Sequence, residues 1–403
     1  MKQKSIYVLV TAIVCVLTLL VFSFVFDFWH QTPESRVVRV GFVFAEDEST
    51  PYTSNFYLAR STMQESLGDK VETITLSNVH SKEAEEPIRE LIRKGCDLII
   101  MNDEGSVPAE LAAEFPEVQF CQISSDTVSA EGKTDNFHTF NGEIYEGRYV
   151  SGIVAGMKLR ELLDNGIITP DEAKVGYVAP RVCSEAISGW TAFLLGVRSV
   201  APEAVLQVKY TGSWNSYGKE KKSAQELIED GCLILTHHTN TGATATVCET
   251  AAESGKTVYF IRYNQAMMDI APTATLTSLR VNWAPYITGA ATAVLNKKKI
   301  ENTVVGNAHG QDMSGGFSKG WLEIAEINSQ TVAPGTEEAI NQAIEQICRG
   351  RLEVFKGNYT GTDPDNPEDT IDLSAGYAEN KDSSCASFHY ILDGYVTVSP
   401  VGQ

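Results

Sequence analysis

Hydrophobic and polar positions alternate along this chain in a pattern that occurs twice. Residues 226–235 (ELIEDGCLIL) repeat the pattern of residues 90–100 (ELIRKGCDLII), with a charged periodic helix, a glycine and a short apolar strand. Glycine just past a helix relieves the left-handed backbone strain that ends it. Helices that alternate with short apolar strands indicate βαβ units around a parallel sheet. The repeat therefore predicts two similar α/β domains, with one large doubly wound sheet as the alternative.

The rest of the pattern predicts where the chain passes between the two domains. Strand 275–281 and helix 286–297 look like a return to the first domain, and the chain crosses back after Val304. Several crossings would build a hinge with a cleft between two lobes. The expected division is an N-terminal segment at 1–28, lobe 1 at 36–142 plus 272–302, lobe 2 at 143–271 plus 303–356, and a C-terminal tail at 357–403 with a closing strand at 395–398.

The helix predicted over residues 146–163 carries a group of small residues. Ser151, Gly152, Ala155 and Gly156 recur at helical spacing and lower the helix propensity of this segment. That cost is typical of a helix whose backbone lies close to a neighbouring element.

An uncharged segment near the N-terminus indicates the cellular location of the protein. Lys2 and Lys4 precede residues 5–26, which contain no charged residue and are long enough to cross a bilayer as a helix. Positive charge before the span favours an N-terminus inside and the rest of the chain outside. We expect an uncleaved transmembrane anchor, which would make this a cell-membrane protein with extracytoplasmic binding domains. Lipidation at Cys15 and a cleaved signal peptide are the alternatives.

Composition and cysteine spacing narrow the class of protein. The 403 residues carry 32 Lys+Arg against 52 Asp+Glu, a formal net charge of −20. A surface this acidic repels nucleic acid, so we expect no nucleic-acid partner. The eight cysteines form no CxxC pair, so neither a thiolate zinc site nor a redox motif is supported. A Cys348–Cys385 disulfide is conceivable in an exported protein.

Several segments occur in an order that resembles a known family. They read EGRYVSGIVAGM, KVGYVAP, FLLGVRSVAPEA, YTGSWNSYGKEKKSAQELIEDG, HTNT, RYNQAMM, LTSLRVNWAPY and CRGRLEVFKG. From about Val37 to Gly357 the chain resembles the basic membrane protein (BMP) family of ABC-transporter substrate-binding proteins, whose best-known members are purine nucleoside receptors. The resemblance implies a type I periplasmic-binding-protein fold, in which two flavodoxin-like lobes joined by a multi-strand hinge close on a small-molecule ligand. It also implies ABC permease subunits as partners, and we expect a monomer without cofactor.

Aromatic residues at family positions are candidates for stacking on a ring. Tyr52, on the first loop, and Trp214, in GSWNS, are predicted to face each other across the ligand. Each stacked base contributes about 1–3 kcal/mol. Core or surface packing is the alternative for both residues. Trp283, in NWAPY, matches a family tryptophan that is either scaffold or cleft wall.

Polar residues on the same loops are candidates for the edges of the ligand. Asn240 and Asn264 stand where relatives often have Asp. Asn both donates and accepts hydrogen bonds, whereas ionised Asp only accepts them. The loss of both carboxylates therefore puts recognition of a ribose diol in doubt. Arg262 stands where a small residue is expected, and either an ion pair with a neighbouring carboxylate or an acidic ligand group would explain it. The other candidates are Asn55, Ser125, Asp126, His238 and Thr241.

Two other functions remain as alternatives to a transport receptor. The chain has no GxSxG, HExxH or GxxxxGK[ST] motif, so an exported enzyme has no positive support and we expect no catalytic residue or bound metal. A membrane-anchored sensor that binds a ligand without transport is the second alternative. The sequence favours a tethered receptor that captures a small polar, ring-containing solute, preferably a nucleoside or nucleobase, by hinge closure.

Overall fold

The computed structural model describes Thr18 and residues 36–103, 109–125, 128, 134–264 and 268–399. The chain divides into two compact units, Met1–Val37 and Val38–Gln403. Among the described residues no helix is both long and apolar enough to span a bilayer. The expected anchor at 5–26 lies outside the described residues except for Thr18.

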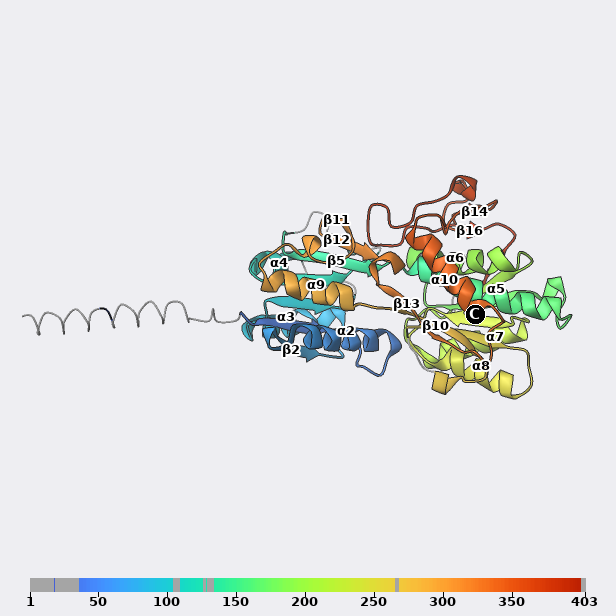
Figure 1. The fold of residues 1–403 in the computed structure, drawn as a ribbon, viewed down its shortest axis with the longest axis horizontal. Helices are drawn as coiled ribbons and strands as arrows, with labels where there is room; N and C mark the ends of the chain where they lie inside the picture. Colours follow the sequence, from blue (N-terminus) through green and yellow to red (C-terminus); the bar gives the residue numbers. More distant parts are fainter. Residues whose placement is uncertain are drawn as a thin grey trace, which may run out of the picture. The chain divides into compact units, whose positions relative to one another are not determined.

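The first of two seven-stranded sheets has the order β11-β12-β5-β4-β3-β1-β2 (Figure 1). Its strands are β1 (Val38–Val43), β2 (Val71–Leu76), β3 (Leu98–Met101), β4 (Gln119–Ile123), β5 (Phe137–Gly142), β11 (Asn307–His309) and β12 (Asp312–Gly315). All neighbours pair in parallel except β11 with β12. The central order β2-β1-β3-β4-β5 is that of a flavodoxin-like sheet.

The second sheet has the order β13-β10-β9-β8-β6-β7-β17. Its strands are β6 (Lys174–Ala179), β7 (Val205–Tyr210), β8 (Ile234–His237), β9 (Tyr259–Tyr263), β10 (Thr275–Val281), β13 (Leu322–Ile327) and β17 (Val396–Ser399). The part β7-β6-β8-β9-β10 repeats the order of the first sheet, and β13 is antiparallel to β10. The repeated sequence pattern therefore corresponds to two separate sheets with the same central strand order, and not to one large doubly wound sheet.

The repeated sequence pattern occupies equivalent places in the two sheets. Helix α3 (Glu85–Arg93) leads into β3, and helix α7 (Tyr217–Glu229) leads into β8. The glycines that follow these helices, Gly95 and Gly231, have φ of +79° and +88°. A side chain at either position would be strained, so glycine is what allows each helix to turn into its strand.

Helices cover both faces of each sheet. Helices α2 (Pro51–Leu67) and α9 (Ala284–Leu295) pack on one face of the first sheet, and α3 and α4 (Ala109–Glu114) pack on the other. On the second sheet, α5 (Ile144–Asp164), α6 (Ser184–Val200) and α10 (Thr336–Cys348) lie opposite α7 and α8 (Ala243–Glu253). Short 3-10 helices occur at Gly68–Lys70, Ser81–Glu83, Pro170–Glu172, Met268–Ile270, Ile300–Asn302, Phe317–Lys319 and Leu373–Ala375.

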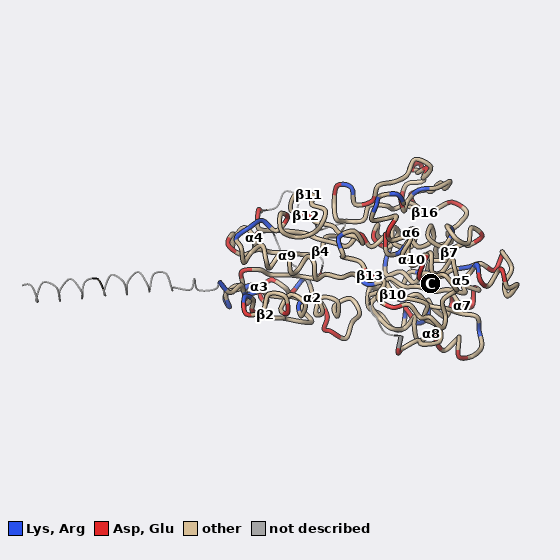
Figure 2. Tube along the Cα trace, in the orientation of Figure 1, with Lys and Arg blue, Asp and Glu red and all other residues tan. Residues whose placement is uncertain are grey.

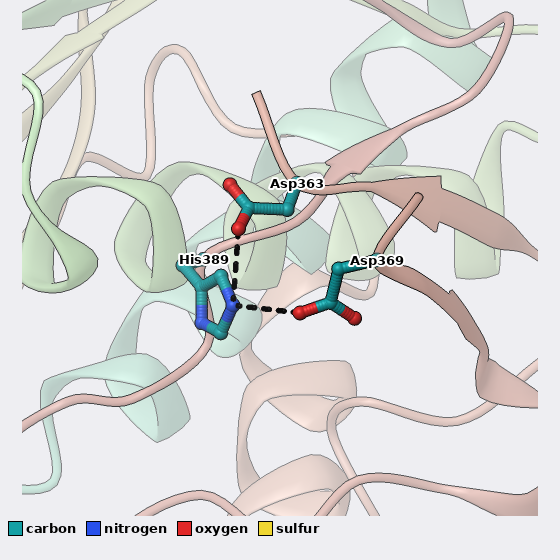
Figure 3. A group of neighbouring side chains, drawn as sticks. All are labelled: Asp363, Asp369 and His389. Atoms are coloured by element: carbon teal, nitrogen blue, oxygen red, sulfur yellow. Dashed lines mark ion pairs between the residues drawn. The ribbon is translucent and has the colours of Figure 1, made fainter. Parts of the chain in front are cut away.

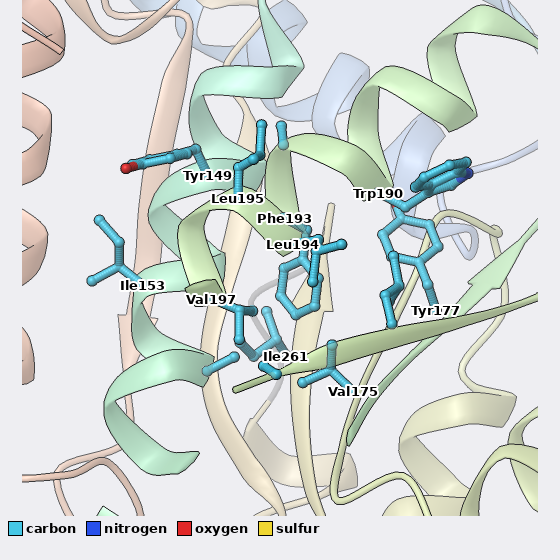
Figure 4. Close-up of a cluster of buried hydrophobic side chains, with 14 of the residues drawn as sticks. Tyr149, Ile153, Val175, Tyr177, Trp190, Phe193, Leu194, Leu195, Val197 and Ile261 are labelled. Atoms are coloured by element: carbon cyan, nitrogen blue, oxygen red, sulfur yellow. The ribbon is translucent and has the colours of Figure 1, made fainter. Parts of the chain in front are cut away.

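The core of the second sheet depends on close contact between α5 and α6. Tyr177 from β6 and Phe193 from α6 are fully buried in this cluster (Figure 4). A Cβ at Gly152 of α5 would lie 2.1 Å from the carbonyl oxygen of Phe193. A Cβ at Gly196 of α6 would lie 2.0 Å from the carbonyl oxygen of Tyr149. The prediction of a close helix contact at the small residues is confirmed, because only glycine fits there.

The chain crosses between the sheets at places that differ from those expected. Thr275–Val281 was assigned to the first lobe, but as β10 it pairs with β9 and β13 in the second sheet. The crossing follows it, and α9 packs on α2. The return was expected after Val304, but β11 and β12 still belong to the first sheet, where β12 pairs with β5. The three crossings therefore lie between β5 and α5, between β10 and α9, and between β12 and β13.

Two buried carboxylates meet where the first and third crossings approach each other. Glu143 and Glu146 both lie against the Gly316 backbone, where a Cβ would come within 2.8 Å and 2.0 Å of their oxygens. Glu143 accepts hydrogen bonds from Asn307 and Ser314, and Glu146 accepts one from the Phe317 N–H at 2.8 Å. Burial, followed by the charge of Glu143, raises the pKa of Glu146 to about 8.

The C-terminal tail is more ordered than its turn-rich sequence indicates. It forms a sheet of β14 (Thr360–Thr362), β15 (Thr370–Asp372) and β16 (Ile391–Leu392). The expected closing strand, β17, pairs in parallel with β7 at the edge of the second sheet. The side chains of Phe388 and Leu392 are fully buried in the core of that sheet, so the tail is part of the folded unit.

Residues 379–388, which we call the C-terminal strap, touch elements of both large sheets. The Ser384 N–H donates to Asp312 Oδ2 at 2.6 Å, and Cys385 Sγ donates to the Ser125 carbonyl at 2.9 Å. At the other end, Glu379 accepts hydrogen bonds from Ser188 of α6 and from the Phe388 N–H. The strap thus adds a noncovalent tie to the three backbone crossings.

Charged residues and thiols are dispersed over the described residues. Acidic and basic positions are interspersed along the trace (Figure 2). All seven described cysteines are free thiols, so Cys348 and Cys385 do not form the disulfide that an exported location would permit. Cys348 is exposed, whereas the thiol of Cys385 contacts Ser125.

The α5–α6 contact predicts the effect of adding a single methyl group. Gly152→Ala should lower the free energy of unfolding by about 1–3 kcal/mol, because the new Cβ overlaps the Phe193 carbonyl. Urea unfolding of the full-length chain would measure this. The matched control is Gly218→Ala in α7, where a Cβ meets nothing within 4 Å, and it should be neutral or stabilising. Equal stability of the two variants would contradict the close contact.

The raised pKa of Glu146 predicts a pH dependence. Between about pH 5 and 8 the folded chain holds a proton at Glu146 that the unfolded chain releases, so this group makes folding less favourable as pH rises. Glu146→Gln can still accept the Phe317 hydrogen bond and carries no charge. Its stability relative to the unmodified chain should therefore increase from pH 5 to pH 8 in urea unfolding, whereas Glu253→Gln on an exposed position of α8 should show no such trend.

Candidate functional site

A cavity of about 260 Å³ lies where the strands of both large sheets end. The residues that line it are Ala45, Glu46, Tyr52, His80, Asn102, Asp103, Ile123, Asn141, Ile144, Glu185, Trp214, Asn215, His238, Asn240, Tyr263, Asn264 and Trp283. Most of them belong to the ends of β1 to β10 or to the residues directly after them. Ligands of open α/β sheets bind outside the carboxyl ends of the strands, where the strand order reverses. This cavity has that position in both sheets.

Tyr52 is held against the first sheet by its hydroxyl group. It lies in the first turn of α2, one residue after Pro51, although a loop was expected there. Proline suits this position because its missing N–H is not needed in the first turn. The Tyr52 hydroxyl donates to the Asn102 carbonyl at 3.0 Å, and the Asn102 side chain accepts from the Ala45 N–H at 2.9 Å. The ring is thereby fixed beside the loops that follow β1 and β3.

Trp214 is the aromatic residue that the second sheet contributes to the cavity wall. It lies after β7, and its carbonyl accepts a hydrogen bond from the Asn240 N–H at 2.8 Å. Its ring meets the ring of His238 edge-on, with centroids 5.8 Å apart. The loops after β7 and β8 thus position Trp214, His238 and Asn240 as one group.

His238 and Glu185 form a hydrogen-bonded pair in the wall of the cavity. His238 Nε2 lies 3.1 Å from Glu185 Oε1, and Nδ1 lies 3.1 Å from the hydroxyl of Tyr177. Burial, reinforced by the charge of Arg148, lowers the pKa of His238, so the imidazole is neutral near pH 7. The carboxylate can only accept, so Nε2 carries the proton and Nδ1 accepts from Tyr177.

The guanidinium of Arg148 supplies positive charge behind this pair. Arg148 is 1% exposed and lies 3.8 Å from the centre of the Tyr263 ring and 5.3 Å from that of Tyr177. Burial alone would raise the pKa of Glu185, but the His238 hydrogen bond and the nearby arginines lower it. Glu185 therefore stays ionised and presents a carboxylate to the cavity.

Trp283 forms part of the cavity wall and of the core. Its ring stacks on Phe56 at a centroid distance of 4.9 Å and is 1% exposed. Its Nε1–H is buried and has no hydrogen-bond partner among the described residues. A buried unpaired donor is costly.

Asn264 and Asn55 connect the two sides of the cavity. Asn264 follows β9 with φ of +67°, a left-handed conformation that asparagine tolerates better than most residues. Its carbonyl accepts a hydrogen bond from Asn55 Nδ2 of α2 at 2.8 Å. Asn264 lines the cavity, whereas Asn55, one helical turn beyond Tyr52, does not.

Four of the predicted binding residues therefore lie outside the cavity wall, and a fifth cannot be placed. Besides Asn55, Thr241 donates to Glu220 at 2.7 Å beside α8. Arg262 is 2% exposed. Burial lowers the pKa of its guanidinium, and the nearby carboxylates of Glu326 and Glu220 oppose this shift. Ser125 pairs with Val128 through the backbone and accepts from Cys385. Asp126 lies outside the described residues.

Six predicted residues line the cavity, and several unpredicted residues join them. The predicted six are Tyr52, Trp214, His238, Asn240, Asn264 and Trp283. The most consequential residues that sequence reasoning missed are Asn102, Asn141, Glu185 and Tyr263. Each lies at the end of a strand or at the start of the helix that follows one, and that position was the available signal.

The charge of the cavity wall restricts the ligand. Three carboxylates line it, those of Glu46, Asp103 and Glu185, and no Lys or Arg is found among the described lining residues. An anionic ligand would face like charges in a poorly solvated space. Neutral or cationic solutes with hydrogen-bond donors and an apolar face suit the arrangement.

Comparisons with known proteins identify the family of this chain. Residues 39–350 match the ABC transporter substrate-binding protein PnrA-like (Bmp) family. A purine-binding protein of Brucella abortus is 28% identical over 326 residues, which cover 79% of this chain and 83% of that protein.

Two solved structures share the fold. A solute-binding protein of an ABC transporter system from Conexibacter woesei superposes with a TM-score of 0.57 at 19% identity, covering 78% of this chain and 98% of that one. One from Aeropyrum pernix gives a TM-score of 0.61 at 15% identity, covering 78% and 92%. The chain belongs to the PnrA-like family of ABC-transporter substrate-binding proteins.

Proposed function

We propose that this substrate-binding protein captures a neutral nucleoside or nucleobase and presents it to the permease subunits of an ABC importer. The observation that carries the proposal is the cavity itself, with aromatic rings and carboxylates and without Lys or Arg in its described wall. Its volume of about 260 Å³ is slightly below the range of about 300–1,000 Å³ that is usual for ligand pockets. A solute of one or two rings fits that size.

Ring recognition rests on residues from both sheets. Tyr52 and Trp214 both line the cavity, the first held by its hydroxyl bond to the Asn102 carbonyl and the second by its backbone bond to Asn240, and their rings are proposed to stack on the solute. The purine ligand named for the Brucella abortus relative supports the same class of solute.

Glu185 is proposed to replace the missing family carboxylates. Asn240 and Asn264 lack the charge with which an aspartate would accept bonds from ribose hydroxyls. Glu185 stays ionised in the same wall and is oriented by His238. A carboxylate from α6 could therefore accept the donors of a ribose or of a base N–H.

Binding is proposed to couple to movement of the two sheets relative to each other. Three backbone crossings join them, and the Asn55–Asn264 hydrogen bond connects their loops directly at the cavity. Closure would bury the solute on both faces, as in other hinge-bending binding proteins.

The uncharged segment at 5–26 is proposed to tether the protein to the membrane, with the binding region outside the cytoplasm. The length of the segment and the preceding Lys2 and Lys4 support this arrangement. The full-length chain should remain in the membrane pellet after alkaline carbonate extraction, and a chain beginning at Arg36 should not. Release of the full-length chain into the supernatant would contradict an anchor.

Thermal unfolding of the full-length chain with candidate solutes tests the ligand class. A nucleoside or base at 100 times its Kd should add about 2.7 kcal/mol of stability and raise Tm by several degrees. The corresponding nucleoside monophosphate should give little shift, because its phosphate would meet three carboxylates. A shift with sugars or amino acids alone would discard the nucleoside assignment while leaving a solute receptor.

The same measurement with Glu185→Gln tests how the solute is held. We expect about a tenfold or larger increase in Kd, since a hydrogen bond to a charged group contributes about 1.5–3 kcal/mol. Glu229→Gln, on an exposed position of α7, is the matched control and should leave Kd unchanged. Unaltered affinity in a folded Glu185→Gln protein would remove this carboxylate from the site.

A further inference from the structure

Three side chains of the C-terminal tail converge away from the ligand cavity. Asp363 follows β14, Asp369 precedes β15 and His389 precedes β16, and Figure 3 shows the three pointing toward one another. One ligand atom from each lies within 4.8 Å of the other two. His389 Nε2 is 3.9 Å from Asp363 Oδ2 and 4.0 Å from Asp369 Oδ2.

The hydrogen bond made by Nδ1 of His389 determines whether Nε2 carries a proton or a lone pair in the neutral imidazole. His389 Nδ1 lies 2.7 Å from the Ser387 carbonyl oxygen. A carbonyl only accepts, so Nδ1 carries the proton, and in the neutral imidazole Nε2 has a lone pair. That lone pair faces two carboxylate oxygens, so a cation placed between the three acceptors would be bound by all of them.

The two carboxylates are also fixed by their outer oxygens. Asp363 Oδ1 accepts the Asp365 N–H at 2.9 Å, and Asp369 Oδ1 accepts the Tyr390 hydroxyl at 3.1 Å. Each Oδ2 is left to face His389. Metal-binding side chains are typically oriented by outer hydrogen bonds of this kind. Neither carboxylate forms an ion pair with Lys or Arg within the described part of the chain.

We propose that Asp363, Asp369 and His389 bind a divalent transition-metal ion, for which Zn²⁺ is the probe. One imidazole nitrogen and two carboxylate oxygens form a donor set that zinc accepts, with water in the fourth position. Two ligands at about 2.1 Å from one tetrahedral ion lie about 3.4 Å apart. The two distances from His389 Nε2, 3.9 and 4.0 Å, therefore have to shorten by roughly half an ångström. The two carboxylate oxygens lie within 4.8 Å of each other and would also have to approach, which partly exposed side chains allow.

The ion would fasten the turn at 363–369 to the segment that continues the C-terminal strap. Phe388, next to His389, is fully buried and stacks on Phe355 at a centroid distance of 4.5 Å. The groups that the ion would join lie in the tail and do not line the ligand cavity, so the ion would brace the tail and would not contact the solute. The site stands independently of the proposed nucleoside specificity.

Zinc binding by the full-length chain, without a histidine tag and after treatment with EDTA, tests the proposal. Calorimetric titration with ZnCl₂ should show one site per chain, and X-ray absorption of the complex should show one nitrogen and two or more oxygens at about 2.0–2.2 Å. His389→Gln and Asp369→Asn should each weaken binding at least 100-fold. Tyr390→Phe keeps the ring and removes the outer hydrogen bond, so about tenfold weaker binding is expected.

Asp365→Asn is the matched control, because it removes a carboxylate from the same turn while keeping the N–H that Asp363 accepts. Its affinity for zinc should stay within about threefold of the unmodified chain. Stoichiometric binding that persists in His389→Gln would place the ion elsewhere and overturn the proposal. Absence of binding at millimolar ZnCl₂, or equal loss in Asp365→Asn and Asp369→Asn, would overturn it as well.

Discussion

The constraint on which this structure depends is that parallel strands end at a common edge. In each large sheet the second strand along the chain lies outside the first, as β2 lies beside β1 and β7 beside β6. The direction in which successive strands are added therefore reverses beside the first strand of each sheet. Loops at such a reversal diverge and leave space between them. The cavity is lined by loops of this kind from both sheets, and its residues are brought together from positions as distant as Ala45 and Trp283.

The arrangement of charged side chains in and behind the wall is the feature of this cavity that most restricts its ligand. Arg148 lies buried between two tyrosine rings, where it disfavours a proton on His238 and helps to keep Glu185 ionised. The positive charge is thus placed behind the wall, while the carboxylate faces the solute. A substitution at Arg148 would alter the electrostatics of the site although its side chain does not line it.

Much of the architecture could be predicted because it depends on local patterns. Gly95 and Gly231 end equivalent helices, and the small residues of α5 mark a close helix contact, so both were visible in the sequence. The sheet to which a buried parallel strand belongs is a nonlocal property. The sequence of Thr275–Val281 would suit a strand in either sheet. The prediction that it belongs to the first sheet was wrong, because it pairs with β9 in the second.

The candidate site was predictable to the extent that it follows strand ends. Trp214, Asn240 and Asn264 lie in the segments that follow β7, β8 and β9, and all three line the cavity. Arg262 lies within β9, where successive side chains point to opposite faces, and it is buried away from the cavity. Glu185 begins a helix, and nothing in its immediate sequence reveals that His238 lies 3.1 Å away.

The C-terminal strap offers a means of changing the proposed domain motion without changing the ligand contacts. It joins Asp312 of β12, in the first sheet, to Ser188 of α6, which packs on the second sheet, through residues that do not line the cavity. Under the proposed closure, opening must stretch or release these bonds as well as bend the three crossings. Mutations in the tail could therefore change the lifetime of the bound solute while its selectivity is preserved, which gives evolution a route to adjust uptake kinetics without redesigning the pocket.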